Sequence, residues 1–305
     1  QTEWKSKNII EVTATTIIIT IIIMTILRKK ISKKANAKIN LFLDVLGKRE
    51  DGFHEIRTIF SEISLSDRLN FTLTKNRAIQ ILTNIDSLNN QKNLAFIVAK
   101  YIQRVYKVPY GVKIDIQKNI PVAAGLGGGS SDAAAVINAL SEIWNLELKE
   151  NDKNRIAAKF GSDINFFLKG GTALGEGRGE KIKSIEPIEI NNILLVKPAF
   201  EIRSSVAYKE VRDIHENNDW KKLVNLKDKK YVYNKLQEGI ENKYQIIKDT
   251  LNKMLSFNAE KAILSRSGPT MIGFFDERVK MEVANEFFKK NDFWTKKTKT
   301  IKKAK

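Results

Sequence analysis

A glycine-rich segment that runs straight into an alanine-rich one constrains the fold of this chain more than any other feature. PVAAGLGGGSSDAAA, residues 121–135, holds four glycines, two serines and five alanines. The preceding residues VKIDIQK alternate apolar and polar side chains and predict a strand. The residues after the glycines repeat apolar side chains at helical spacing: Ala133, Val136, Ile137, Leu140 and Trp144. The predicted order is strand, glycine loop, helix.

This order favours the binding of an anion. The first turn of a helix exposes unpaired backbone N–H groups and the positive end of the helix dipole. Glycines let the backbone approach a phosphate closely, and Ser130 and Ser131 can cap the helix or donate to phosphate oxygens. The spacing matches neither GxxxxGK[ST] nor GxGxxG, because the sixth position from Gly125 is Ser130. A tight loop for close packing is the structural alternative.

The rest of the chain mixes strands and helices without strict alternation, which predicts an α+β fold. Strands are expected within 37–71, over 193–198 and on both sides of a tight loop in 259–276. Residues 161–181 are expected to form a turn and a hairpin-like region. Helical spacing marks residues 92–106, about 150–160, 231–256 and 277–290.

Composition excludes several classes of site. The 305 residues include no cysteine and two histidines, so disulfides and cysteine-based metal sites or nucleophiles are excluded. The formal net charge of +18 is concentrated near the ends, with +7 in residues 289–305 and +5 in residues 28–34, which leaves +6 elsewhere. Without an aromatic-basic module, this distribution indicates solubility or weak phosphate attraction, not specific nucleic-acid binding.

An apolar run near the start has two interpretations. Residues 9–27, IIEVTATTIIITIIIMTIL, are long enough to span a bilayer as a helix, and the basic residues RKKISKK follow them. Such an anchor would hold the following domain in the cytoplasm. A disordered or spurious extension is the equal alternative. A cleaved signal peptide is not expected, because no small-residue cleavage site follows.

Four segments in order resemble the GHMP kinase family: AKINLFLDVLGKREDGFHEI, PVAAGLGGGSSDAAA, GSDINFFLKGGTALGEGRGEKI and SRSGPT. The resemblance covers about residues 33–285. It is to the members that phosphorylate 4-diphosphocytidyl-2-C-methyl-D-erythritol in the non-mevalonate isoprenoid pathway. It therefore implies ATP-dependent transfer of a phosphoryl group to a hydroxyl of that substrate, giving the 2-phosphate.

The resemblance also implies a two-lobed arrangement. A ribosomal protein S5 domain 2-like, ATP-binding lobe is expected over residues 33–190, and a ferredoxin-like lobe over residues 191–290. A hydrophobic extension, residues 1–32, would precede them, and a basic tail, residues 291–305, would follow. The oligomeric state stays open.

Two residues match the catalytic positions of the family. Asp163, in GSDINFF, matches the aspartate that orients or deprotonates the attacking hydroxyl, although an Asp after Gly-Ser is by itself more typical of a helix cap. Lys38, in AKIN, matches the active-site lysine. A lysine near Asp163 would keep the carboxylate ionised and offset the charge of the transferring group. An exposed strand position is the alternative for Lys38.

Substrate-binding positions are implied at four residues: Asn40, Phe53, His54 and Tyr208. Asn40 shares a strand face with Lys38. Phe53 stands where the family usually has tyrosine, so ring stacking on cytosine would survive without the hydroxyl contact, and His54 would bond the base edge. Tyr208 would form a second aromatic wall, with an ordinary core tyrosine as its alternative. Stacking is worth about 1–3 kcal/mol per base.

ATP is the implied cofactor, with Mg²⁺ to offset phosphate charge. The metal ligands stay unassigned, since the glutamate that some family members use has no clear counterpart. Arg266, in SRSGPT, stands where relatives generally have glycine, and it could add a phosphate contact or crowd the loop. The implied ATP-binding residues are Asn93, Lys118, Pro121, Val122, Ala123, Ala124, Gly125, Leu126, Gly127, Gly128, Gly129, Ser130 and Ser131.

Two alternatives to the cytidine-linked substrate stay open. Another GHMP kinase, of the homoserine or mevalonate type, would share the glycine loop but would have no cytosine to hold, so DGFH and Tyr208 disfavour it. The second alternative is a basic nucleic-acid-binding α+β protein with a degenerate glycine loop. The expected partner is the small-molecule substrate, with membrane contact only if residues 9–27 form an anchor.

Overall fold

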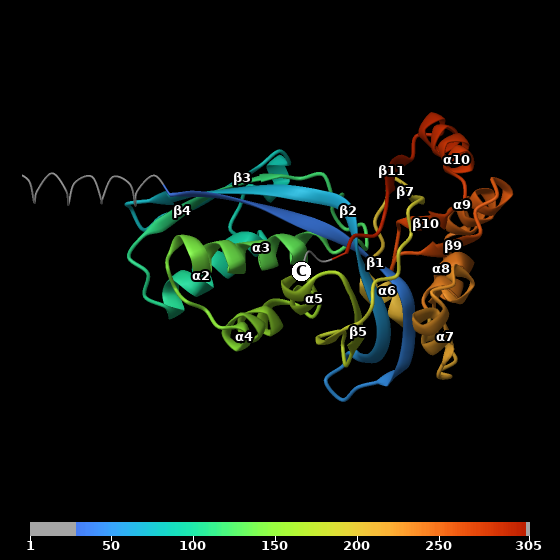
Figure 1. Ribbon diagram of the computed structural model, residues 1–305, viewed down its shortest axis with the longest axis horizontal. Coiled ribbons are helices and arrows are strands. Elements are labelled where there is room, and N and C mark those ends of the chain that lie inside the picture. Colours follow the sequence, from blue (N-terminus) through green and yellow to red (C-terminus); the bar gives the residue numbers. More distant parts are fainter. Residues whose placement is uncertain (1–28, 303–305) are drawn as a thin grey trace, which may run out of the picture.

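A computed structural model describes residues 29–302. Its first sheet has seven strands in the order β3-β4-β2-β1-β8, with β5 paired to β2 and β6 paired to β5. The long strands β1 and β2 are antiparallel and extend across much of the molecule (Figure 1). The strands are β1 (Lys30–Lys48), β2 (His54–Thr74), β3 (Ile79–Thr83), β4 (Gly111–Gln117), β5 (Thr172–Glu176), β6 (Lys181–Ser184) and β8 (Tyr233–Asn234).

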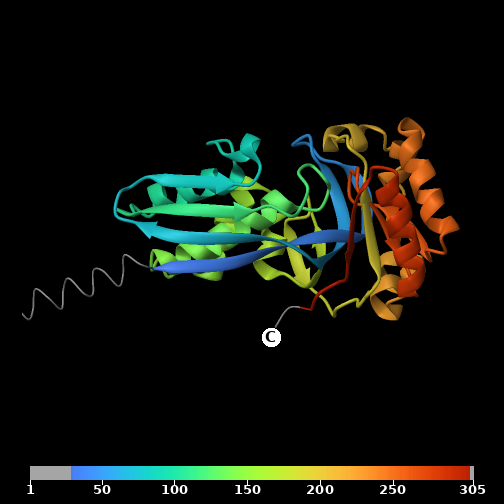
Figure 2. The ribbon, with the colours of Figure 1, turned by 90° about the horizontal axis from the view of Figure 1, so that it is seen from above.

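Four helices pack against one face of this sheet (Figure 2). They are α2 (Leu94–Val105), α3 (Gly128–Ile143), α4 (Glu150–Phe160) and α5 (Ile164–Lys169). The alanines at the start of α3 are buried, and their small side chains let the helix lie close to its neighbours. The alanine-rich segment therefore packs against the rest of the fold, and the glycines before it form the start of the helix.

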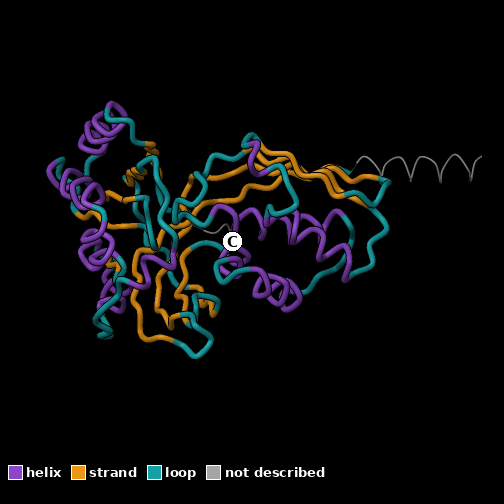
Figure 3. The backbone as a smooth tube through the Cα atoms, turned by 180° about the vertical axis from the view of Figure 1, so that it is seen from behind, coloured by secondary structure: helices purple, strands orange, loops and turns teal. Residues whose placement is uncertain are grey.

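The second sheet has four antiparallel strands in the order β11-β7-β10-β9. These are β7 (Ile193–Lys197), β9 (Lys261–Leu264), β10 (Met271–Phe274) and β11 (Trp294–Thr298). The α-helices that come after β7 in the chain lie at the same end of the molecule as this second sheet (Figure 3). They are α6 (Ser204–Lys209), α7 (Asp219–Leu226), α8 (Gln237–Lys243), α9 (Gln245–Ser256) and α10 (Arg278–Lys290).

Strand β7 shows how the two sheets are joined. Its five residues are all buried. Leu194 and Val196 belong to the core that includes residues of α8, α9 and α10, whereas Ile193 and Leu195 belong to the core that includes Ile39 of β1. Alternate side chains of a strand point to opposite faces, so one apolar run serves both cores and fixes the second sheet against the first.

The α+β fold is confirmed, and the helices expected over 92–106, 150–160 and 277–290 are α2, α4 and α10. Residues 231–256 are mainly helical, as expected: they contain the short β8 followed by α8 and α9, which the extended backbone of Tyr244 separates. The hairpin-like region over 161–181 contains the short helix α5 before its strands.

Part of the expected basic tail is a strand. Residues 294–298 form β11 at the edge of the second sheet, with Lys296 and Lys297 exposed. Lysines on an edge strand discourage pairing with another chain, which accounts for basic residues within a folded element. The apolar run 9–27 lies outside the described residues. Within residues 29–302, none of the helices combines the length and apolar character needed to cross a bilayer.

Candidate active site

The glycine loop lies between β4 and α3. Gly127 is the N-cap of α3 and has a left-handed backbone, φ +73, as does Gly125, φ +74. Glycine adopts this conformation without steric cost. The prediction that Ser130 or Ser131 caps the helix is wrong. Helix α3 begins at Gly128, so both serines lie within its first turn, and no side chain caps the helix. The free N–H groups of this turn are therefore available to an anion.

The glycines of the loop are required for different reasons. A Cβ at Gly125 would lie 2.5 Å from the Ser265 carbonyl oxygen, and one at Gly127 would lie 2.8 Å from the Phe167 ring. Close packing thus accounts for these two glycines. A Cβ at Gly129, by contrast, would meet no atom within 4 Å. The structural alternative of a tight packing loop leaves Gly129 unexplained, whereas close approach of a ligand explains it.

Lys38 and Asp163 meet in a buried cluster with Arg266. Lys38 Nζ lies 3.8 Å from Asp163 Oδ2, and the Arg266 guanidinium donates to the same oxygen at 2.6 Å. Lys38 Nζ also donates to Asn40 Oδ1 at 2.5 Å. The register of β1 against β2 shifts on both sides of Lys38–Asn40, and such irregularities re-aim side chains next to functional sites.

Asp163 has the N-cap position of α5 but makes no capping hydrogen bond through its side chain. Its carboxylate faces the two cations instead. Burial raises the pKa of this carboxyl group, but Arg266 and Lys38 outweigh burial and hold the pKa below its usual value. Asp163 is therefore ionised at neutral pH. Its Oδ1 accepts no hydrogen bond within residues 29–302.

Lys38 is fully buried, and its amine gains or loses a proton near neutral pH. Burial lowers the pKa of Lys38 to about 7, although the Asp163 carboxylate opposes the shift and Arg266 adds to it. The neighbouring Asn40 is tied in turn to Thr58, whose hydroxyl accepts from Asn40 Nδ2 at 2.6 Å. The cluster is thus fixed to both β1 and β2.

We expect Lys38→Met to change how stability depends on pH. Between pH 7 and the ordinary lysine pKa of 10.5, the unfolded chain binds the Lys38 proton and the folded chain does not. The free energy of unfolding of the wild type should therefore rise with pH in this window relative to the variant. Urea unfolding of both proteins at pH 7 and pH 9 measures this difference, and parallel pH dependence would refute it.

Two cavities lie on either side of this cluster. The first, of about 600 Å³, is lined by the glycine loop, Asn93, Lys118, Asp132 and the 201–204 segment. The second, of about 630 Å³, is lined by Lys48, Gly52, Phe53, His54, Ser162, Arg178, Ser205, Tyr208 and Lys209. Ser204 and Arg266 line both cavities. The two spaces therefore meet at the residue that bonds Asp163.

The second cavity gathers the expected aromatic residues. Phe53 is 54% exposed, and the Arg178 guanidinium lies 4.8 Å from the centre of its ring. His54 stacks on Tyr208 with ring centroids 4.9 Å apart. Burial, with a smaller contribution from Lys48, lowers the pKa of His54, so its neutral ring can both donate and accept a hydrogen bond. Flat rings and a neutral imidazole suit a planar heterocycle.

Asn93 and Lys118 line the first cavity, but their side chains also have structural partners. Asn93 caps α2 by accepting from the Ala95 N–H at 2.9 Å. Lys118 Nζ lies between two buried carboxylates, with Asp132 Oδ2 at 2.7 Å and Asp67 as the other partner. Both residues thus line the first cavity, and their hydrogen bonds hold its walls.

One side chain at the first cavity is a candidate ligand for a divalent cation. No group of three or more His, Asp or Glu side chains gathers as a metal site within residues 29–302. Asp132 Oδ1, however, is buried and lacks a hydrogen-bond partner in the described part of the chain. Mg²⁺ is typically held by one or two carboxylates together with substrate phosphates, so a single aspartate beside the glycine loop fits such an ion.

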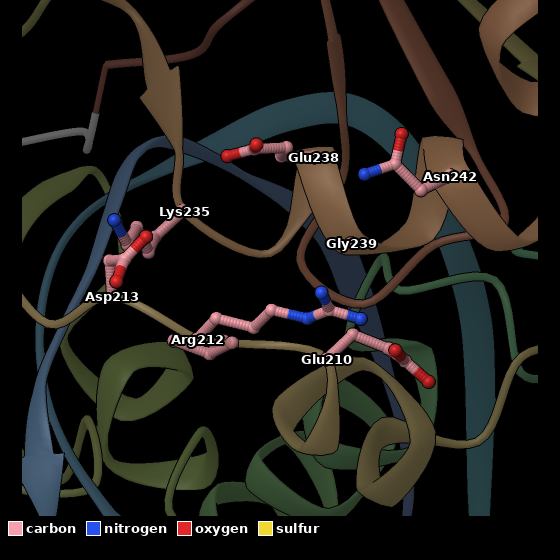
Figure 4. A pocket seen from close by; sticks show the side chains of 8 residues that line it. Glu210, Arg212, Asp213, Lys235, Glu238, Gly239 and Asn242 are labelled. Carbon is pink, nitrogen blue, oxygen red and sulfur yellow. The ribbon is translucent and has the colours of Figure 1, made fainter.

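A smaller hollow of about 160 Å³ lies beyond the end of α6 (Figure 4). Acidic side chains from Glu210, Asp213 and Glu238 and basic ones from Arg212 and Lys235 line it. The two basic side chains offset two of the three carboxylates, so a single negative charge is left over. None of the residues expected for ATP or substrate lies there.

Several residues of the site have no signal in the sequence. Arg178 lies in the turn between β5 and β6 and reaches Phe53 only through the pairing of β5 with β2. Ser204 is the first residue of α6 and lines both cavities. Asp67 is distant from Lys118 along the chain, and only the pairing of β2 with β4 brings it near. These contacts depend on tertiary structure, not on local motifs.

The chain is similar to known proteins over most of its length. The family model for the GHMP kinases N terminal domain matches residues 93–171. The chain is 37% identical over 278 residues to the 4-diphosphocytidyl-2-C-methyl-D-erythritol kinase of Clostridium novyi, covering 87% of this chain and 99% of the relative. It is 40% identical over 249 residues to the protein of the same name from Bacillus cytotoxicus, covering 79% and 86%.

Solved structures show the same likeness. A crystal structure of 4-(cytidine 5'-diphospho)-2C-methyl-D-erythritol kinase matches with a TM-score of 0.77 and 27% identity, covering 89% of this chain and all of that one. The L. major mevalonate kinase in complex with R-mevalonate matches with a TM-score of 0.65 and 14% identity, covering 91% of this chain and 98% of that one. The second likeness, at low identity, concerns the fold alone.

Proposed function

The chain belongs to the 4-diphosphocytidyl-2-C-methyl-D-erythritol kinase family of GHMP kinases, and we propose from this premise that its two joined cavities receive ATP and the cytidine substrate. It is an ATP-dependent kinase of the isoprenoid pathway with a small-molecule substrate. The observation that carries our assignment of the cavities is their shared border at Arg266, which bonds Asp163. A phosphoryl group crossing this border passes Asp163, a carboxylate held between Lys38 and Arg266.

In this proposal the first turn of α3 and the glycine loop bind the phosphates of ATP through backbone N–H groups. The acceptor hydroxyl attacks the γ-phosphorus from the second cavity, ADP leaves, and Asp163 Oδ1 takes the hydroxyl proton. Phosphoryl transfer depends mainly on positioning and charge neutralisation. Lys38, within 3.8 Å of Asp163, keeps the carboxylate oriented and ionised.

We propose that Mg²⁺ accompanies ATP and that Asp132 holds it. The unpaired Oδ1 of Asp132 is buried at the wall of the first cavity. Ser130, in the first turn of α3, lines the same cavity and offers a hydroxyl oxygen. When bound, the ion neutralises phosphate charge.

Recognition of the cytidine is assigned to Phe53, His54 and Tyr208. We expect His54→Ala to raise the KM for the cytidine substrate by about tenfold, since a hydrogen bond and a stacked ring are lost. The KM for ATP should stay close to the wild-type value, because His54 lines the second cavity and not the first. Steady-state kinetics with each substrate varied in turn measures both effects. A larger rise for ATP would overturn the assignment of the cavities.

We expect Gly129→Ala to weaken ATP binding without weakening the fold. The added methyl group would meet no protein atom within 4 Å, and alanine favours a helix over glycine by about 1 kcal/mol. Calorimetric titration with ATP and thermal unfolding separate the two effects. If binding is unchanged, phosphates do not lie against this turn.

Gly128→Ala is the matched comparison one residue earlier. There a Cβ would lie 3.0 Å from Ile120, so some loss of stability is expected together with any loss of binding. Only Gly129→Ala should combine weaker binding with equal or greater stability.

The kinase assay tests the function itself. The purified chain should release ADP with 4-diphosphocytidyl-2-C-methyl-D-erythritol and ATP, but not with homoserine or mevalonate. The homoserine and mevalonate alternatives have only structural likeness at 14–15% identity in their favour, and the comparisons do not favour the nucleic-acid alternative. Equal turnover of mevalonate would overturn the substrate assignment.

A further inference from the structure

Arg266 is the residue whose position the family resemblance does not explain. It lies in the loop between β9 and β10, and its guanidinium donates to Asp163 Oδ2 at 2.6 Å. Its side chain lines both the glycine-loop cavity and the aromatic cavity. Of the residues that line the two cavities, Arg266 is the shared one that carries a charge, whereas Ser204 is neutral.

The backbone that carries Arg266 is held in place. Its φ of +53 lies in the left-handed region, which is unfavourable for a residue with a side chain. The Arg266 carbonyl accepts from Asn234 Nδ2 at 2.7 Å, and the Ser265 hydroxyl donates to the Gly125 carbonyl at 3.1 Å. The loop is thus tied both to β8 and to the glycine loop. An unfavourable conformation fixed by neighbouring contacts is typical of a functional position.

Arg266 has donors available for an anion at the border of the two cavities. Its side chain is 31% exposed there, whereas that of its partner Asp163 is 4% exposed. One guanidinium nitrogen of Arg266 bonds Asp163, and a guanidinium carries five N–H donors. A phosphoryl group at this border would accept from the remaining donors, because a guanidinium matches its oxygens with parallel N–H groups.

We propose that Arg266 contacts the γ-phosphoryl group of ATP and stabilises it during transfer, an inference that rests on the proposed function. On ATP binding the guanidinium shares its donors between Asp163 and the γ-phosphoryl oxygens. This adds a side-chain contact to the backbone contacts of the glycine loop. It makes Arg266 a catalytic residue of this chain, at a position where the resemblance implies glycine.

Arg266→Gly tests the proposal with little risk to the fold, since glycine adopts a φ of +53 without cost. We expect kcat to fall by about tenfold, the value of one charge-assisted hydrogen bond. Affinity for the non-hydrolysable analogue AMP-PNP should fall by a similar factor. Affinity for ADP, which has no γ-phosphoryl group, should stay within about twofold of wild type, and Arg266→Lys should recover part of kcat because it keeps the charge.

Lys227→Gly is the matched control. It also removes one positive charge from a left-handed position, φ +55, but lies at the exposed end of α7, away from both cavities. Its kinetics and nucleotide affinities should equal those of wild type. Unchanged or faster turnover in Arg266→Gly would overturn the proposal and indicate that Arg266 restrains Asp163. An equal loss of ADP affinity would also overturn it, since Arg266 would then support the loop and not the γ-phosphoryl group.

Failure of the proposed function gives a different result. A wild-type chain that does not phosphorylate the cytidine substrate contradicts the function. The comparison of ADP with AMP-PNP in wild type and Arg266→Gly does not need turnover, so it still decides the contact with the γ-phosphoryl group.

Discussion

Asp163→Asn is expected to reduce kcat by about two to four orders of magnitude, the range for loss of a general base. The amide can still accept the hydrogen bond from Arg266 but cannot take the proton of the acceptor hydroxyl. ATP affinity should stay near or above the wild-type value, because removal of the carboxylate leaves Lys38 and Arg266 facing the phosphates. Single-turnover kinetics and equilibrium binding of ATP separate the two effects.

The structure also removes the competing explanation for this variant. The Asp163 side chain makes no capping hydrogen bond to α5, so loss of a cap cannot account for a loss of activity. Asp152→Asn is a suitable control, since Asp152 lies in the first turn of α4 and pairs with Arg155 at 2.5 Å, outside both cavities. Full activity in Asp163→Asn would exclude this residue from the mechanism.

The sequence predicts much of this site because its chemistry is coded locally. Glycines at 125 and 127 occupy left-handed positions that the loop requires, and the spacing of Lys38 and Asn40 places both on one strand face, where they bond each other. Such features depend on neighbours along the chain. The same holds for the helices α2, α4 and α10, whose apolar spacing matches their buried faces.

Tertiary partners are where local patterns fail. An Asp after Gly-Ser has the pattern of a cap, yet Asp163 faces Lys38 and Arg266 because β1 and the β9–β10 loop meet there. The pattern of residues 231–256 predicts mainly helix, but it does not predict the extended backbone at Tyr244 that divides α8 from α9. The lysines of residues 294–298 look like a solvated tail until β7 supplies a partner strand. Each outcome depends on a segment far away in the sequence.

Lys118 also has partners that lie far away in the sequence. Lys118→Met is expected to destabilise the fold by about 3–5 kcal/mol, the cost of removing one partner of a buried ion pair. Its ammonium lies between the carboxylates of Asp67 and Asp132, both buried. Burial raises the pKa of Asp132 to about 7 against the attraction of Lys118, and Asp67 raises it further. Without the lysine, two carboxylates face each other with no cation between them. Urea unfolding at pH 7 measures the loss.

Two further variants separate this role from direct contact with the nucleotide. Lys113→Met, on strand β4, which ends one residue before Lys118, breaks an exposed pair with Asp115 at 3.2 Å and should cost at most about 1 kcal/mol. Adding Asp132→Asn to Lys118→Met should recover part of the stability, because a single buried carboxylate then remains. A Lys118→Met variant as stable as wild type, but with weak ATP binding, would show that Lys118 acts on the nucleotide and not on the fold. The stabilities of the single and double variants therefore decide whether this lysine supports the cavity wall or contacts its ligand.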